Sequence, residues 1–113
     1  LFYITQALFF SVSFISLMYH PYSSEWHTVK GYRLIQEGKI KEAKTHYKKA
    51  LKISPDNVAA RNNLKLIRME SLINKAYELH LNKDYASARN IYIQILKIDE
   101  NNKWAQENLA ELP

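Results

Sequence analysis

Apolar residues recur at helical spacing along most of this 113-residue chain, and breaks in that spacing divide it into helices. No stretch alternates apolar and polar residues for long enough to indicate a strand. A first helix is expected near 25–37, ending at Gly38, because glycine suits the left-handed conformation just past a helix end. A second helix is expected near 39–53. The pattern therefore predicts an all-α chain.

The second helix ends at a Ser-Pro-Asp turn, where Ser54 or Asp56 is the expected N-cap of the helix that follows. After Asn57 no Gly or Pro occurs until the last residue. The apolar stripe continues through this stretch, so 57–82 is either one long helix or two helices that join near 68–71.

Two further helices complete the expected fold. Asp84 is the expected N-cap of a helix near 85–98, and Asp99 that of a helix near 101–112. The chain has only two Gly and three Pro against plentiful Leu, Ile, Lys, Ala and Glu, a composition that favours helices.

The first 24 residues contain no Asp, Glu, Lys or Arg, and the first 19 are mostly large and apolar. As a helix, those 19 would span about 28 Å, close to the thickness of bilayer hydrocarbon. Tyr19, Tyr22 and Trp26 suit a membrane–water interface. We therefore expect a transmembrane anchor at 1–20 and an interfacial linker at 21–24, which makes this a single-pass protein of a bacterial inner membrane or an organellar membrane.

A signal peptide is the alternative for this segment. A signal peptide has a basic front end and a shorter apolar core before a small-residue cleavage site. Here the apolar run is longer, its flank is aromatic and no A-x-A site follows. Within the expected anchor, polar residues project onto one side of a helix, where they would form a seam against other membrane helices or satisfy their own backbone. These transmembrane-seam residues are Gln6, Ser13, Ser16 and His20, together with Thr5.

The chain also repeats itself. Shifting the sequence by 45 residues aligns 31–67 with 76–112, and eleven of the 37 pairs are identical. Most of these are apolar or small and sit at helical spacing, so what is duplicated is a packing scheme. Repeats of this size build extended surfaces rather than catalytic pockets.

The repeated residues resemble the tetratricopeptide repeats, whose unit is a helix pair of 34 residues. Gly31, Ala43 and Pro55 stand 12 apart as in the family pattern, and Ala43 and Tyr47 match its A-x₃-F element. The second copy keeps Ala76, Ala88 and Tyr92. The resemblance predicts that both tyrosines are buried between helices and that both A-x₃-F alanines lie at close helix crossings.

The resemblance implies an antiparallel helix-pair solenoid that fills the rest of the chain, 25–113. Repeats are expected at about 24–57 and 69–102, and the sequence departs from the family period because 58–68 inserts an extra helical stretch. A C-terminal capping helix is expected at 103–112.

In this family the first helix of each pair lines a concave groove that binds a helix or an extended peptide. The match assigns six residues to this groove: Thr28, Tyr32, Ile35, Ile73, Tyr77 and His80. Chaperone-binding members hold a C-terminal carboxylate with a Lys/Asn clamp. Here Thr or Ile occupies the Lys place and Tyr the Asn place, so docking of chaperone tails is not expected.

No constellation for catalysis is found, so the chain is not expected to be an enzyme, and no cofactor or metal site is predicted. Cysteine is absent, which excludes disulfides and thiol chemistry. The four His residues do not share the i, i+4 spacing of a metal site. Glu42 and His46 do stand at i, i+4, a spacing more typical of a surface hydrogen bond.

The expected second helix is amphipathic, with a basic stripe on one face that consists of Lys41, Lys44, Lys48 and Lys52. The stripe is either a solvated face that keeps the domain soluble or a contact for lipid headgroups or an acidic partner. The formal charge of +5 fits either use. Nucleic acid is not an expected partner, because no stacking aromatics interleave with the lysines.

We interpret the chain as a membrane-anchored adaptor, scaffold or small structural subunit of a larger membrane-associated complex. Its expected partners are other protein subunits and membrane lipid, and a second copy of the chain is a further candidate. The alternative function is a receptor that captures peptide segments of client proteins at the membrane.

Overall fold

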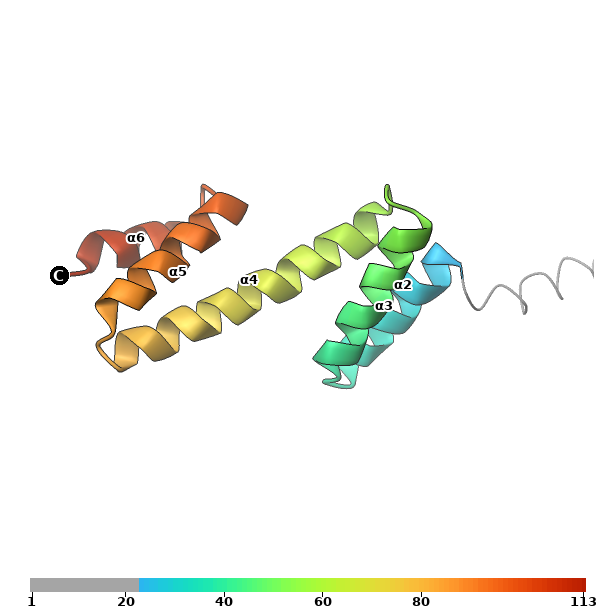
Figure 1. Ribbon diagram of the computed structural model, residues 1–113, viewed down its shortest axis with the longest axis horizontal. Helices are drawn as coiled ribbons and strands as arrows, with labels where there is room; N and C mark the ends of the chain where they lie inside the picture. The colour runs from blue at the N-terminus through green and yellow to red at the C-terminus, as the bar shows by residue number, and fades with distance from the viewer. Residues whose placement is uncertain (1–22) are drawn as a thin grey trace, which may run out of the picture. The chain divides into compact units, whose positions relative to one another are not determined.

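The computed structural model describes residues 23–113, which form the helices α2 (Ser24–Gln36), α3 (Ile40–Ile53), α4 (Val58–Leu81), α5 (Tyr85–Ile98) and α6 (Lys103–Glu111) (Figure 1). This part of the chain has no strand, which confirms the all-α prediction for it. The chain divides into two compact units between Arg61 and Asn62, called here the first and second units.

The predicted anchor at 1–20 and its polar seam of Gln6, Ser13, Ser16 and His20 lie outside the described residues. Among residues 23–113, no helix combines the length and apolar character needed to cross a bilayer. The first described helix, α2, begins at Ser24, and the Ser23 side chain caps it by accepting the backbone N–H of Trp26 at 3.1 Å.

Two predicted helix starts are wrong, and the correction is the same in both repeats. Asn57, not Ser54 or Asp56, caps α4, because its Oδ1 accepts the Ala60 N–H at 2.9 Å. The Asp56 carboxylate instead accepts a hydrogen bond from the Ser54 hydroxyl at 2.6 Å. Exactly 45 residues later in sequence, Asn102 rather than Asp99 caps α6 through the Ala105 N–H.

The remaining helix boundaries follow the local chemistry. Asp84 caps α5 as predicted, accepting the Ser87 N–H at 3.2 Å. The stretch left open between one helix and two is one continuous helix, α4. No Gly or Pro interrupts it, and its Ala, Leu, Lys and Arg residues have high helix propensity.

The first helix of each repeat ends in the same hydrogen-bonded cap. After α2, the Lys39 N–H reaches the Leu34 carbonyl at 2.8 Å, while Gly38 adopts φ +76°. After α4, the corresponding bond runs from the Asp84 N–H to the Leu79 carbonyl at 2.9 Å, and Lys83 adopts φ +58°. The second repeat therefore places a lysine where the left-handed conformation favours glycine.

In the first unit, α2 and α3 pack as an antiparallel pair (Figure 1). Ala43 and Tyr47 of α3 are fully buried, as predicted. Gly31 makes the close approach possible, since a Cβ atom placed on it would lie only 2.7 Å from Cε1 of Tyr47. Ala60, in the first turn of α4, is also fully buried.

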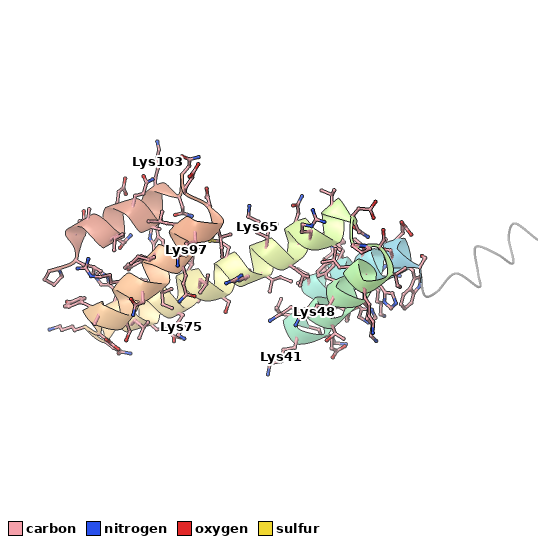
Figure 2. The ribbon with its side chains drawn as sticks, turned by 45° about the horizontal axis from the view of Figure 1, so that its top comes forward. Lys41, Lys48, Lys65, Lys75, Lys97 and Lys103 are labelled. Carbon is pink, nitrogen blue, oxygen red and sulfur yellow. The ribbon has the colours of Figure 1, made fainter. Side chains whose placement is uncertain are left out.

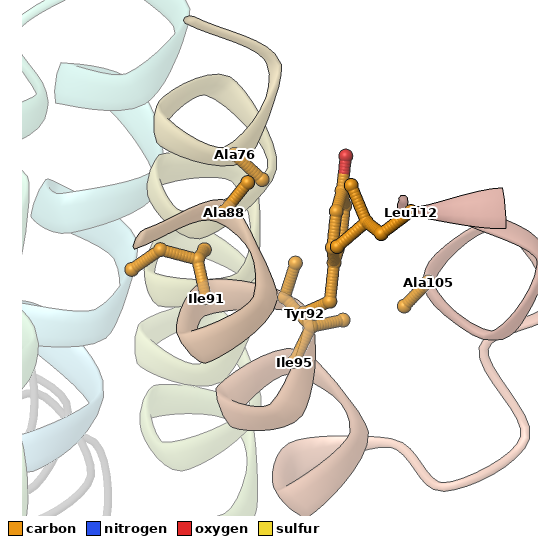
Figure 3. Packing of buried hydrophobic residues seen from close by; sticks show 7 residues of the cluster. All are labelled: Ala76, Ala88, Ile91, Tyr92, Ile95, Ala105 and Leu112. Atoms are coloured by element: carbon orange, nitrogen blue, oxygen red, sulfur yellow. The ribbon is translucent and has the colours of Figure 1, made fainter. Parts of the chain in front are cut away.

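The second unit has a larger apolar core, drawn from α4, α5 and α6 (Figure 3). Ala88 and Tyr92 are buried as predicted, and the Tyr92 and Trp104 rings pack in a T-shaped arrangement with 5.4 Å between ring centroids. The cluster comprises Ala76, Ala88, Ile91, Tyr92, Ile95, Ala105 and Leu112. α6 thus covers the core of this unit, in the place expected of a capping helix.

Candidate functional site

The most exposed of the predicted groove residues are two tyrosines at equivalent positions of the two repeats. Tyr32 on α2 is 56% exposed and Tyr77 on α4 is 59% exposed. By contrast, the tyrosines of the two A-x₃-F elements, Tyr47 and Tyr92, are buried. Large aromatic side chains that do not contribute to a core are typical of interaction surfaces.

The other four groove residues have roles in the fold of their own unit. Ile73 packs against the core of the second unit, and His80 is half-buried with its Nδ1 3.1 Å from the Tyr92 hydroxyl. In the first unit, Ile35 is half-buried, and the Thr28 hydroxyl donates to the Ser24 carbonyl at 2.9 Å. The tyrosines are therefore the groove residues most available to a partner.

A polar network holds the start of α2 in the first unit. The Asn57 amide donates to the Ser24 hydroxyl at 2.6 Å and to the Thr28 hydroxyl at 3.0 Å. The Ser24 hydroxyl in turn donates to the Ala50 carbonyl at 2.9 Å. Asn57 thus caps α4 with its oxygen and ties two hydroxyls of α2 with its nitrogen.

Beside this network lies an open pocket of about 460 Å³ in the first unit. Its lining combines two carboxylates, three polar groups and small apolar side chains: Glu25, Thr28, Val29, Ser54, Asp56, Asn57 and Ala59. The hydrogen bond from Ser54 lowers the pKa of Asp56, with a further contribution from its backbone, so this carboxylate is ionised at neutral pH. The pocket is suited to a basic or hydrogen-bond-donating group.

A contact between two histidines, which the sequence pattern did not predict, joins α2 and α3. His27 of α2 and His46 of α3 face each other with their Nδ1 atoms 2.9 Å apart, a hydrogen-bond distance. His46 thus directs this nitrogen at His27 and not at Glu42, its predicted partner. The Trp26 ring meets both imidazoles edge-on, with centroid separations of 5.1 and 5.8 Å.

Burial is the main cause that lowers the pKa of both histidines. For His27 the charge of Lys49 adds to the effect. For His46 the further causes are His27 and then the lysines Lys49 and Lys30, while Glu42 opposes them. The fold therefore favours the neutral form of the pair.

The repeat itself carried the signal that could have revealed this pair. With the 45-residue shift, His27 aligns with Leu72 and His46 with Ile91. Ile91 belongs to the core of the second unit, and Leu72 packs against it. The first unit thus has two facing histidines at positions that are apolar in the second.

A second difference between the repeats concerns their buried tyrosines. The Tyr92 hydroxyl has His80 as its partner, whereas the Tyr47 hydroxyl has no hydrogen-bond partner among the described residues. The 45-residue shift explains why, because Ile35 occupies the place of His80 in the first repeat. Burial raises the pKa of both tyrosines.

The basic stripe of Lys41, Lys44, Lys48 and Lys52 is exposed along α3. Figure 2 labels Lys41 and Lys48, which extend from this helix. In residues 23–113, no cluster of three or more His, Asp or Glu side chains is arranged to hold a metal ion.

The fold defines a class, that of helical-hairpin repeat proteins, and sequence comparison places the chain within it. Two family models, described as "TPR repeat" and "Tetratricopeptide repeat", match residues 31–67 and 70–102. Together they cover more than half of the chain. The chain belongs to the tetratricopeptide repeat family, as the residue pattern indicated.

Among curated proteins, the chain is similar to the DnaJ homolog subfamily C member 7 homolog of Schizosaccharomyces pombe (strain 972 / ATCC 24843). The two are 31% identical over 97 residues, which is 85% of this chain and 20% of that protein. The chain thus spans about one fifth of the length of this relative. No solved structure matches the chain.

Proposed function

We propose that this chain is an adaptor that binds other proteins through the exposed faces of its repeats. The observation that carries the proposal is the pair of exposed tyrosines, Tyr32 and Tyr77, at the same position of two repeats. A tyrosine supplies a large contact area and a hydroxyl at low entropic cost, and aromatic anchors dominate many protein interfaces. Tetratricopeptide repeats in general mediate contacts between proteins.

The two carboxylates in the pocket of the first unit narrow the chemistry of the bound segment. Val29, which is 53% exposed, lies on α2 one turn before Tyr32 and also lines the open pocket. The pocket adds the carboxylates of Glu25 and Asp56 to this apolar side chain. A segment that carries a Lys or Arg next to apolar residues would match both features.

The direct test uses the tagged full chain, purified in mild detergent, with mass spectrometry of the proteins that accompany it. Truncation of an aromatic anchor costs about 2 kcal/mol or more of binding energy. The double variant Tyr32→Ala, Tyr77→Ala should therefore lose its partner and keep its helix content. If the folded variant retains every partner, the tyrosines do not form the binding surface.

We further propose that residues 1–20 attach this adaptor to a membrane, as a subunit of a membrane-associated complex. The support is the uncharged apolar run in the sequence and the aromatic residues that follow it. Carbonate extraction of membranes should leave the chain in the pellet. Release into the supernatant would refute the attachment and leave the adaptor proposal standing.

The runner-up function is a receptor for peptide segments of client proteins, which the open pocket of the first unit favours. The two functions predict a different stability of the free chain and a different behaviour toward its partners. A structural subunit should copurify in a fixed ratio, whereas a receptor should be stable alone and bind short peptides weakly. Peptide titration of the purified chain separates them.

A further inference from the structure

The net charge of the chain is confined to one helix pair. Residues 24–53, which contain α2 and α3, carry eight Lys or Arg and three Asp or Glu, an excess of five positive charges. Residues 62–113 carry seven of each sign and are neutral. The whole formal charge of +5 therefore resides on the first unit.

Most of this excess lies on the exposed side of α3. The four stripe lysines project within an arc of about 80° of this helix at 3.6 residues per turn. All four side chains are exposed. The one salt bridge found among the described residues joins Lys39 to Glu37, so the stripe lacks paired carboxylates there.

The second repeat provides an internal comparison for this face. On α5, the positions that match Lys41, Lys44, Lys48 and Lys52 hold Ala86, Arg89, Ile93 and Lys97. Both helices bury the same small and aromatic positions, so the shared packing scheme does not require a lysine stripe. A requirement for solubility alone would apply to both helices equally.

We propose that the basic stripe of α3 binds the anionic headgroups of a lipid surface. Charge complementarity requires a negatively charged partner with a spread of charge along the helix. The sequence favours lipid over an acidic protein because the apolar run at 1–20 stands directly before this helix pair in the chain. This choice of partner rests on the membrane attachment proposed above.

The attraction between the lysine stripe and the lipid headgroups should depend on charge and on salt, as an electrostatic interaction does. Each lysine near an anionic membrane contributes about 1 kcal/mol, so each lysine removed weakens the contact about five-fold. Added salt should weaken it as well, because exposed charges are screened over about 10 Å at 0.1 M salt. A zwitterionic surface should not attract the stripe.

The experiment exploits the absence of cysteine from the chain. Single-cysteine variants Thr45→Cys and Asn90→Cys place one polarity-sensitive dye at matched exposed positions of α3 and α5. The full chain is reconstituted into vesicles of phosphatidylcholine alone or with 30% phosphatidylserine. The dye at position 45 should shift its emission to the blue in the anionic vesicles only, and the dye at position 90 should not.

Two lysine-to-glutamine variants complete the test. Replacement of Lys41, Lys44, Lys48 and Lys52 should abolish the shift at position 45. Replacement of Lys65, Lys75, Lys97 and Lys103 removes the same charge from exposed positions of the second unit and should preserve the shift (Figure 2). Circular dichroism checks that both variants fold.

The outcomes separate this proposal from the membrane attachment. A dye at position 45 that responds equally in both lipid mixtures, or not at all, overturns the lipid contact and leaves an acidic protein as the partner class. A stripe-dependent shift in a chain that carbonate releases from membranes would refute the anchor. The stripe would then act as a peripheral lipid contact.

Discussion

His27 and His46 meet across α2 and α3 with their Nδ1 atoms 2.9 Å apart. One ring must present N–H and the other a lone pair for this contact to be a hydrogen bond. A singly protonated pair can still form it, but a doubly protonated pair would set two N–H donors and two charges against each other. The folded pair therefore holds fewer protons than two free histidines do at low pH.

The first prediction is that the first unit loses stability on acidification. The folded pKa of both histidines lies below the unfolded value of 6.5. Their stabilising contribution is therefore complete above pH 6.5 and is lost as the pH falls through the lowered folded pKa values. The slope reaches about 1.4 kcal/mol per pH unit for each proton of difference between the two states.

Trp26 supplies the measurement, because it contacts both imidazoles. Urea unfolding is followed by Trp26 fluorescence in a Trp104→Phe background, from pH 8 to pH 5. The double variant His27→Leu, His46→Ile installs the residues of the second repeat and should flatten the pH dependence. An equally steep dependence in this variant would show that other groups cause it.

The second prediction contrasts the buried tyrosines. Tyr92→Phe breaks the hydrogen bond with His80 and should cost about 1 kcal/mol of unfolding free energy. Tyr47→Phe removes a hydroxyl that has no partner among the described residues, and should be neutral or stabilising by up to about 1 kcal/mol. Urea unfolding measures both free energies. An equal loss of unfolding free energy in the two variants would contradict the inferred difference in hydrogen bonding between the two hydroxyls.

The third prediction concerns the left-handed residues after α2 and α4. Lys83 at φ +58° carries a steric cost that glycine avoids, so Lys83→Gly should stabilise the second unit by about 0.5–1 kcal/mol. Gly38→Ala, at the matching position with φ +76°, should destabilise the first by about 1 kcal/mol. Thermal melts test the direction of both stability changes. A loss of stability in Lys83→Gly would refute the argument.

The fourth prediction compares two N-caps. Asn102→Ala removes one cap bond and should cost about 1 kcal/mol. Asn57→Ala should cost more, because its amide also holds the hydroxyls of Ser24 and Thr28. Chemical unfolding measures both losses, and an equal or smaller loss for Asn57→Ala would show that the network adds no stability.

The repeated packing scheme was predictable from the sequence because it rests on residue size and helical spacing. Ala43, Tyr47, Ala88 and Tyr92 recur with the 45-residue shift and are all buried. The N-caps of α4 and α6 were not predicted correctly, since Asp and Ser are good capping residues in general. Here the Ser54–Asp56 hydrogen bond keeps both in the turn before α4, and Asn57 becomes the cap.

The histidine pair escaped prediction for a different reason. A search for metal spacing considers histidines along one helix, whereas His27 and His46 come from two helices that pack together. Comparison with Leu72 and Ile91 would have marked both positions as core. The exposure of Tyr32 and Tyr77 was expected, but the identity of a partner depends on a surface outside this chain.

The central claim is that Tyr32 and Tyr77 form the protein-binding faces of the two repeats, and photocrosslinking tests it most directly. Benzoylphenylalanine is introduced in cells at position 32 or 77, and at the exposed control positions 45 of α3 and 90 of α5. We expect crosslinks to partner protein from positions 32 and 77 and none from positions 45 and 90. Crosslinks that arise only from the controls, or equally from all four positions, would contradict it.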